Sequence, residues 1–390
     1  MSLGDRRKQL IANLYFRMQR IPESPPTQAA TCTEIDHLFA DNLHSKPFGV
    51  HARDIIREIE LPTATIIPEE PPPFPPWTLA KIAINQICSF GLEKRKSNYP
   101  PAVLKGMFND HKDTTHRGTY HIYTDGSKSN EGVGVGVYAS DFSLSLRLSN
   151  LASNYSAEIH AILEALENID SENHGSITIF TDSLSSIQSI ANMYSNNPII
   201  KSIQAYLLQL SQLNKQVQFC WTPAHVGISG NEEADRLAKQ GTTSNRTNNE
   251  AVAFRDIYPS IKSRIKQAWE ARWSRVTGNK LRRIKDTTAN WNTNFPNRRK
   301  LEVIICRLRI GHTRLTHGHY MERRTSNDCP QCDETPLSVE HVLCECPQYD
   351  LARLSHFGCR NPRLESILGR NLPVESLAKF LLDTGTFNDL

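Results

Sequence analysis

The chain has 390 residues, of which 38% are hydrophobic and 22% charged, and its net charge is +4. This composition is ordinary for a soluble protein of two or three domains and excludes a largely disordered or fibrous chain. No apolar run approaches the roughly 18 to 20 residues that span a bilayer, and the start, MSLGDRRKQL, lacks the apolar core of a secretory signal. We therefore predict an intracellular protein, in the cytoplasm or nucleus, with no membrane partner.

Charge is distributed unevenly along the chain. Residues 119–241 contain 6 Lys and Arg against 12 Asp and Glu, whereas residues 262–324 contain 17 Lys and Arg against 4 acids. A basic block of this kind either contacts nucleic-acid phosphates or is a solvated helix surface, and the charge count alone leaves both interpretations open.

Residues 1–118 are predicted to be mostly a connector with short helices. Residues 1–20 place Leu10, Leu14 and Met18 on one face of an expected amphipathic helix. The Pro-rich stretch at 68–76 favours an extended polyproline II conformation over packed structure. We place a boundary at residue 118 because the pattern of apolar residues changes from Thr119 on.

Residues 119–244 are predicted to form one α/β domain. Five segments have the apolar or alternating pattern of strands: 120–124, 133–139, 143–149, 176–181 and 217–221. Four segments have apolar residues at helical spacing: 155–169, 184–194, 200–213 and 230–241. This order predicts a five-stranded mixed sheet with helices on both faces.

The remainder of the chain divides into three predicted segments. Residues 254–325 have the pattern of basic helices, and three tryptophans lie there: Trp269, Trp273 and Trp291. Residues 326–350 contain a cluster of cysteines, and residues 351–390 are predicted to be a helical tail.

Acidic residues end two of the predicted strands. Asp125 follows YHIYT and Asp182 follows SITIFT, and if the helix 155–169 connects parallel strands, both lie at carboxyl ends of neighbouring strands. Glu158 lies early in that helix and Asp235 early in the last one. Any one of these acids alone is more often a capping or surface residue.

Four carboxylates packed together would raise one another's pKa unless a cation lies between them. Oxygen ligands without an accompanying Cys or His favour Mg²⁺ or Mn²⁺. Two such ions, about 3.5 to 4 Å apart, can activate a water and stabilise the leaving oxygen of a phosphodiester. The four acids therefore predict a site with two divalent ions.

The motifs TDGS, NYSAE, TDS and TPAHVGISGNEEADRLAKQG occur in this order and together resemble the type 1 ribonuclease H domain over residues 119–241. The resemblance implies that the metal ligands are Asp125, Glu158, Asp182 and Asp235. It also implies that His225 assists proton transfer or product release. The family cleaves the RNA strand of RNA–DNA hybrids, so the resemblance predicts a metal-dependent endonuclease with that substrate.

The same resemblance implies a set of residues that contact the hybrid. Asn154 matches a family position that contacts the minor groove, and RNA is distinguished from DNA by its 2′-hydroxyls. The full set of predicted substrate-binding residues is Gly126, Ser127, Asn154, Ser183 and Asn231.

Two alternatives share these motifs. The first is a catalytically silent nucleic-acid-binding remnant of a retroelement, in which the fold remains but turnover is lost. The intact acids and His225 disfavour it. The second is an integrase or resolvase relative with the same sheet, which the GNEEAD ending disfavours.

Four of the nine cysteines lie close together: Cys329, Cys332, Cys344 and Cys346. With His341 they give the spacing Cys-x2-Cys-x8-His-x4-Cys, which is typical of a tetrahedral structural zinc site. Cys344 competes with Cys346 for the fourth position, and we favour Cys346 because its greater separation from His341 leaves the chain room to turn back. Reduced buried cysteines without a metal are the alternative.

This segment also resembles the carboxyl-terminal end of non-LTR retrotransposon polyproteins of arthropod type, on the residues GHTRLTHGHYMERR and CPQCDETPLSVEHVLCECPQY. Residues 1–118 similarly resemble the connector behind a reverse transcriptase. No Tyr/Phe-x-Asp-Asp motif of a polymerase occurs in the chain. The resemblance therefore implies a truncated or separately encoded carboxyl-terminal portion, with a reverse transcriptase as a partner.

Overall fold

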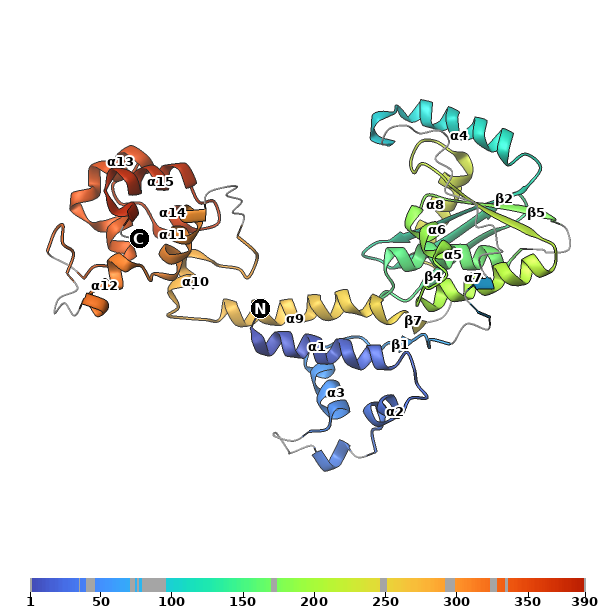
Figure 1. Cartoon of the computed structure of the whole chain (residues 1–390), viewed down its shortest axis with the longest axis horizontal. Helices are drawn as coiled ribbons and strands as arrows, with labels where there is room; N and C mark the ends of the chain where they lie inside the picture. The colour runs from blue at the N-terminus through green and yellow to red at the C-terminus, as the bar shows by residue number, and fades with distance from the viewer. Residues whose placement is uncertain are drawn as a thin grey trace. The chain divides into compact units, whose positions relative to one another are not determined.

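The structure is a computed structural model of the whole chain (Figure 1). It describes residues 2–34, 36–39, 46–70, 74–75, 77–78, 96–169, 174–245, 251–291, 299–322, 328–333 and 336–388. The chain divides into two units, Arg6–Ile265 and Lys266–Leu390, the latter together with Met1–Asp5. Among the described helices, none combines the length and the apolar composition that crossing a membrane requires.

A five-stranded sheet with the order β4-β3-β2-β5-β6 lies at the centre of the first unit. Its strands are β2 (Tyr120–Lys128), β3 (Val133–Ala139), β4 (Ser143–Leu148), β5 (Ser176–Thr181) and β6 (Gln216–Trp221). β2, β3 and β4 form an antiparallel meander, whereas β5 runs parallel to both β2 and β6. The predicted five-stranded mixed sheet is confirmed.

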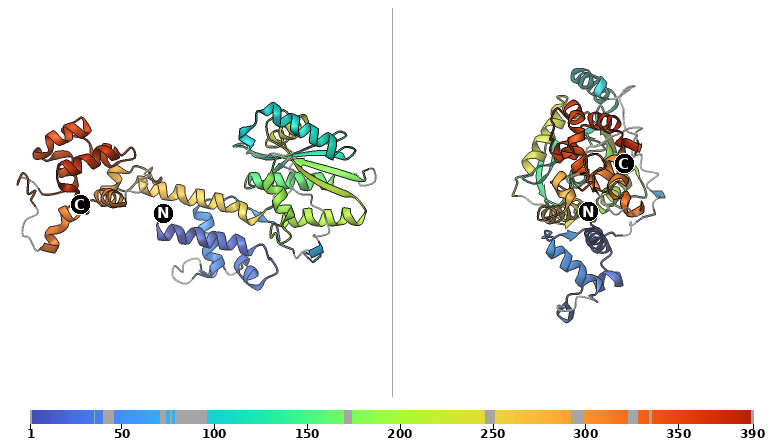
Figure 2. Two further views of the ribbon diagram at one scale, coloured as in Figure 1. Left: turned by 45° about the horizontal axis from the view of Figure 1, so that its top comes forward. Right: turned by 90° about the vertical axis from the view of Figure 1, so that its left-hand side faces the viewer.

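Side chains alternate between the two faces of the sheet because successive residues of a strand point in opposite directions. Ile122, Ile179 and Phe219 belong to the larger core, which also contains apolar residues of α5 (Asn154–Glu167), α6 (Leu184–Ala191) and α7 (Pro198–Gln212). The next residues along, Tyr123, Phe180 and Cys220, belong to a separate cluster with α4 (Pro101–Thr115) and α8 (Ser229–Gly241). The left view of Figure 2 shows α4, in cyan, and α7, in green, on opposite sides of the sheet.

Glycines in β3 allow α8 to lie directly against the sheet. A Cβ atom at Gly134 would lie 2.1 Å from the carbonyl oxygen of Ala238, and one at Gly136 would lie 2.2 Å from that of Ala234. The alternating valines of the same strand are fully buried in the larger core. The VGVGV sequence therefore places side chains on one face and leaves room for a helix backbone on the other, which fixes the helix that carries Asp235.

The helices before residue 70 are α1 (Leu3–Met18), α2 (Pro25–Thr31), η1 (Asp36–Phe39) and α3 (Phe48–Glu58). Ala12, Phe16 and Ile55 pack into the same core as the sheet. The predicted apolar face of the first helix is wrong for Leu10 and Leu14, which are 56% and 47% exposed, whereas Met18 packs against the core as predicted. Apolar residues occur around most of this helix, and the face that is buried is the one that carries the aromatic ring of Phe16.

Two short segments join the beginning and the end of this unit. β1 (Thr65–Ile66) pairs in parallel with β7 (Ala251–Val252), and η3 (Lys96–Asn98) precedes α4. The predicted Pro-rich stretch at 68–76 lies partly outside the described residues, and residues 79–95 of the predicted connector lie entirely outside them.

The second unit is helical. α9 (Ile257–Ser274) follows η4 (Phe254–Asp256) and runs from one unit into the other. The further elements are α10 (Lys280–Ile284), α11 (Arg299–Ile310), α12 (Arg314–Glu322), η5 (His341–Glu345), η6 (Pro347–Tyr349), α13 (Asp350–Phe357), α14 (Leu364–Leu368), α15 (Val374–Asp383) and η7 (Thr386–Asn388). Ile304, Leu308, Leu377 and Phe380 lie in its core.

Candidate functional site

Three carboxylates meet where the parallel pairing of β2 and β5 ends. Asp125 follows the last paired residue of β2, Asp182 follows the last residue of β5, and Glu158 lies in the second turn of α5. One oxygen atom from each lies within 4.8 Å of the others. The side chains of Asp125 and Glu158 are buried, with exposed fractions of 6% and 7%.

Local sequence explains how Glu158 reaches this position. Ser153 caps α5, and its hydroxyl accepts a hydrogen bond from the amide of Ser156 at 3.1 Å, so the helix begins one turn before the glutamate. A Cβ atom at Gly126 would lie 2.4 Å from the amide nitrogen of Glu158. Only glycine therefore lets the helix approach β2 this closely.

The cluster is electrostatically unfavourable by itself. Burial, and then the charges of Asp182 and Asp235, raise the pKa of Asp125 to about 8. Burial, and then the charges of Asp125 and Asp182, raise the pKa of Glu158 to about 9. The backbone amide of Gly126 favours the ionised form of both carboxyls, but it does not offset these effects.

One oxygen of the cluster is buried without a donor. The Oε2 atom of Glu158 has no hydrogen-bond partner among the residues that the structure describes. An unsatisfied buried carboxylate oxygen is costly, and a divalent cation would remove that cost as well as the repulsion between the acids. The residues present therefore fit hard divalent cations such as Mg²⁺ or Mn²⁺.

Asp235 lies beside this group rather than inside it. A side-chain hydrogen bond between Asp125 and Asp235, in which the protonated Asp125 is the donor, is one of the interactions that raise the pKa of Asp125. Its Oδ2 atom accepts a hydrogen bond from the Nζ atom of Lys239, at 2.6 Å, one turn further along α8. Lys239 was not among the predicted site residues. Its spacing of four residues from Asp235 on a helix nevertheless predicts an ion pair between the two side chains.

The other predicted residues do not belong to the group of three acids. His225 is exposed in the loop before α8 and has a positive φ of 57°. Asn154 is exposed at the first position of α5, and Ser127 is half-buried in β2. Ser183 is the N-cap residue of α6. Asn231 is buried, and its Oδ1 atom accepts a hydrogen bond from the hydroxyl of Thr222 at 2.9 Å.

The comparison with protein families agrees with this geometry. Residues 117–243, which include the whole sheet and α8, match the family model described as RNase H. This segment is a ribonuclease H domain. Its sheet is the ribonuclease H fold, and the resemblance expected from the motifs TDGS, NYSAE, TDS and GNEEAD is confirmed.

The ribonuclease H domain has relatives of two kinds. It is 31% identical over 139 residues to Ribonuclease H1 of Homo sapiens. This alignment covers 31% of this chain and 49% of the human protein. Identity to Ribonuclease H1 of Rattus norvegicus is 30% over 141 residues, with the same coverage. Identity to the Pol polyprotein of Ovine maedi visna related virus (strain South Africa) is 30% over 126 residues, or 31% of this chain and 11% of that protein. The chain thus spans about half the length of its Ribonuclease H1 relatives.

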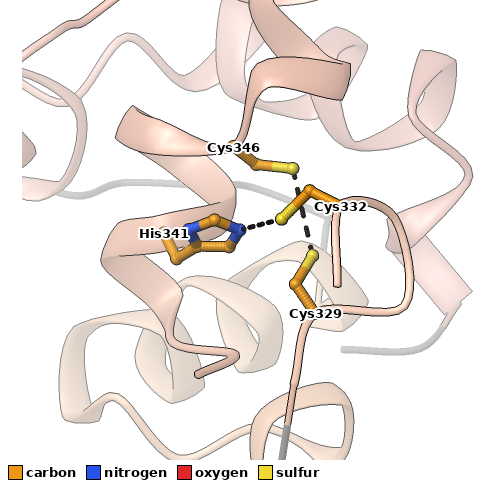
Figure 3. A group of neighbouring side chains, drawn as sticks. All are labelled: Cys329, Cys332, His341 and Cys346. Atoms are coloured by element: carbon orange, nitrogen blue, oxygen red, sulfur yellow. Dashed lines mark hydrogen bonds between the residues drawn. The ribbon is translucent and has the colours of Figure 1, made fainter. Parts of the chain in front are cut away.

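A cysteine-histidine cluster lies downstream of the ribonuclease H domain. Its members are Cys329, Cys332, His341 and Cys346, and their donor atoms lie within 4.8 Å of one another (Figure 3). The Sγ atom of Cys332 lies 3.4 Å from the Nε2 atom of His341, and the Sγ atoms of Cys329 and Cys346 are 3.9 Å apart. The donors face a common centre, as in a four-ligand zinc site (Figure 3).

The structure separates the two cysteines that competed for the fourth position. Cys346 directly follows the π-helical turn η5, and its amide donates a hydrogen bond to the carbonyl of His341 at 2.7 Å. That turn directs the thiol of Cys346 back toward Cys329 and Cys332, so Cys346 occupies the fourth position of the cluster. Cys344 instead packs against the core of the second unit with Leu343 and Ile367.

Proposed function

We propose that this chain hydrolyses the RNA strand of RNA–DNA hybrids, with two Mg²⁺ or Mn²⁺ ions held by Asp125, Glu158, Asp182 and Asp235. The observation that carries this proposal is the cluster of three acids within 4.8 Å, inside a segment that matches the ribonuclease H family. The relatives named Ribonuclease H1 support the same activity.

Each acid has a distinct part in this proposal. Asp125 and Glu158 are buried and would hold an ion from the protein side, whereas Asp182 is half-buried and completes the group. When bound, the two ions supply an activated water and stabilise the leaving oxygen of the phosphodiester. Asp235 would complete the ion site, and Lys239 holds its carboxylate in place through the ion pair.

His225 is proposed to assist proton transfer or product release. It is exposed in the loop that precedes α8, and the positive φ makes it a constrained residue rather than part of a regular element. An imidazole can act as a general acid or a general base, so the residue type suits this role.

Hybrid binding is proposed to depend on the basic region 262–324. The ribonuclease H domain itself carries more acids than bases, so a polyanion needs another source of attraction. Exposed cations in the described part of the region include Lys266, Arg275 and Lys280. The cysteine-histidine cluster is proposed to bind structural Zn²⁺ and so to order the segment that follows this region.

The biological context is proposed to be reverse transcription by a non-LTR retrotransposon, inside the cell, with a reverse transcriptase as partner. The order of a ribonuclease H domain, basic helices and a cysteine-histidine cluster supports this. The competing proposal, a silent nucleic-acid-binding remnant, would retain hybrid binding without cleavage.

Cleavage of a hybrid by the full chain tests this function. The assay uses a labelled RNA strand with Mg²⁺ and compares the wild type with Asp182→Asn and with Glu131→Gln. Glu131 is an exposed acid in the same domain outside the cluster, so it is the matched control. Cleavage by the wild type and by the control, but not by Asp182→Asn, supports the proposal. Hybrid binding without cleavage by any of the three proteins would identify the silent remnant instead.

A further inference from the structure

The first unit contains a further group of His and Cys side chains whose donor atoms lie close together, and it shares no residue with the acid cluster. His111 is in the last turns of α4, His116 is the residue that caps the end of α4, and Cys220 is in β6. Each offers one donor atom, and the three donor atoms lie within 4.8 Å of one another. Cys220 and His116 are 0% and 4% exposed, and His111 is half-buried.

Both imidazole rings are held in a way that suits metal ligands. The Nδ1 atom of His111 lies 3.2 Å from the hydroxyl of Thr115, and the Nδ1 atom of His116 lies 3.2 Å from the hydroxyl of Thr178. Metal-binding histidines characteristically engage an oxygen through the ring nitrogen that does not bind the ion. The Nε2 atoms of both rings are buried, and we assign them as the ligand atoms because each Nδ1 atom lies beside a hydroxyl.

The surroundings of the group are apolar. Cys220 belongs to the cluster formed by Leu104, Phe108 and Phe180, and the ring of His116 packs edge-on against Phe180 with the ring centroids 5.7 Å apart. Burial lowers the pKa of both His111 and His116, which favours the neutral form of each ring. Neutral imidazoles and a thiol in a water-poor site favour a borderline or soft ion over Mg²⁺.

We propose that His111, His116 and Cys220 bind one Zn²⁺ ion, which joins the end of α4 to strand β6. Binding would displace the proton of the Cys220 thiol to solvent. α4 ends before the segment that matches the ribonuclease H family, so the ion would attach a helix from outside that segment to its sheet. With three protein ligands, the fourth position is left for water.

The test is a Co²⁺ titration of the full chain in a Cys329→Ser/Cys332→Ser/Cys346→Ser background, which removes all three thiol ligands of the cysteine-histidine cluster. Co²⁺ reports a thiolate ligand by a charge-transfer absorption band, whereas binding to carboxylates gives no such band. We expect one band-forming equivalent, displaced by Zn²⁺ and lost when Cys220→Ala is added. His111→Gln, at a half-buried position that tolerates an amide, should also lose it. Circular dichroism of each variant establishes that it is folded.

A matched histidine outside the group provides the control. His174 stacks on Tyr120 and does not belong to the cluster, so His174→Gln should titrate like its background. A folded background protein without the band, or a band that persists in Cys220→Ala, would overturn the proposal. Equal loss in His174→Gln would assign the band to general misfolding of the sheet and would also overturn it.

Discussion

The acid cluster and the cysteine-histidine cluster are built from opposite kinds of donor. The first gathers oxygens that repel one another, and burial and this repulsion raise the pKa values of Asp125 and Glu158 to about 8 and 9. The second gathers three sulfurs and a nitrogen, and burial, as the largest cause, raises the pKa of Cys346 to about 11. Both groups are costly without a cation, but only the second has four ligands directed at one centre (Figure 3).

This difference separates a reactive site from a structural one. Hard oxygen ligands around Mg²⁺ leave positions for water and substrate, whereas a closed set of Cys and His ligands leaves none. Loss of ions from the acid cluster should therefore end the chemistry and leave the fold. Loss of the ion from the cysteine-histidine cluster should unfold its segment and leave the chemistry.

The largest expected effect is on the folding of residues 328–346. In Cys332→Ser this segment should lose its structure, because structural zinc contributes on the order of 10 kcal/mol and the small apolar cluster around Cys329 cannot replace it. Hydrogen exchange of the backbone amides measures the loss. Cys359→Ser, an exposed cysteine outside the cluster, is the control. If the backbone amides of residues 328–346 exchange as slowly in Cys332→Ser as in the wild type, the cysteine-histidine cluster has no structural role and the contrast with the acid cluster is wrong.

The next effect is on catalysis. Asp125→Asn should lower the rate of hybrid cleavage by about 10³-fold or more, because the amide removes a charge from the group that fixes the ions. Single-turnover cleavage with Mg²⁺ measures this. Hydrogen exchange in residues 328–346 should remain as in the wild type. A rate within about tenfold of the wild type would exclude Asp125 from the ion site.

His225 separates proton transfer from ion binding within the acid site. His225→Ala should turn over about 10²-fold more slowly while Mg²⁺ affinity is preserved, as expected for a residue that moves protons and holds no metal. The measurement is the rate of cleavage between pH 6 and pH 8. A variant whose rate and pH profile match the wild type would assign His225 to loop structure.

Asp125→Asn should also stabilise the metal-free protein above about pH 4, with a gain that grows up to about pH 8. Below the ordinary carboxyl pKa of 3.8 the group is protonated whether the chain is folded or unfolded, so it contributes no pH dependence. Between that value and about 8, the unfolded chain ionises Asp125 while the folded chain keeps the proton, so folding becomes less favourable as pH rises. The variant escapes this penalty, and we expect a gain on the order of 5 kcal/mol at pH 8.

Urea unfolding in a chelator at pH 4 and pH 8 measures this gain. Glu131→Gln, which replaces an exposed acid outside the cluster, is the matched control. Equal unfolding midpoints of the wild type and Asp125→Asn at pH 8 would contradict the electrostatic description of the acid cluster.

The smallest expected effect is on the salt dependence of hybrid binding. Replacing Lys266, Arg275 and Lys280 with Gln should weaken binding and reduce the slope of log affinity against log salt by about 0.9 for each lost phosphate contact on duplex. A second triple variant, with Gln at the exposed Arg360, Arg370 and Lys379, changes the net charge equally and lies outside the basic region. Equal slopes in the two variants would show that the basic region is a solvated surface.

The sheet and its helices were predictable because their patterns are local. The side chains of VQFCW and SITIFT alternate in character, which predicts a strand with two different faces. The structure places Phe219 and Cys220 in separate apolar clusters. The convergence of Asp125 and Asp182 followed from the parallel pairing of β2 and β5, which a crossover helix imposes.

What the sequence did not predict depends on contacts between distant segments. The buried face of α1 is decided by the core that it meets, so Leu10 and Leu14 were assigned wrongly. His111 and His116 were assigned to a connector, and Cys220 is more than one hundred residues further along. Only the packing of α4 on the sheet brings these three side chains together, and no spacing pattern in the sequence reports it.

The most direct measurement is single-turnover cleavage of an RNA–DNA hybrid by the full chain and by Glu158→Gln, with Mg²⁺ and with a chelator. Glu158 has the buried oxygen without a partner, so its amide should bind hybrid normally and cleave it about 10³-fold more slowly or not at all. The wild type should cleave only the RNA strand and only with the metal. Cleavage by the wild type in the chelator, or equal rates in the two proteins, would contradict the assignment of the acid cluster as the catalytic site.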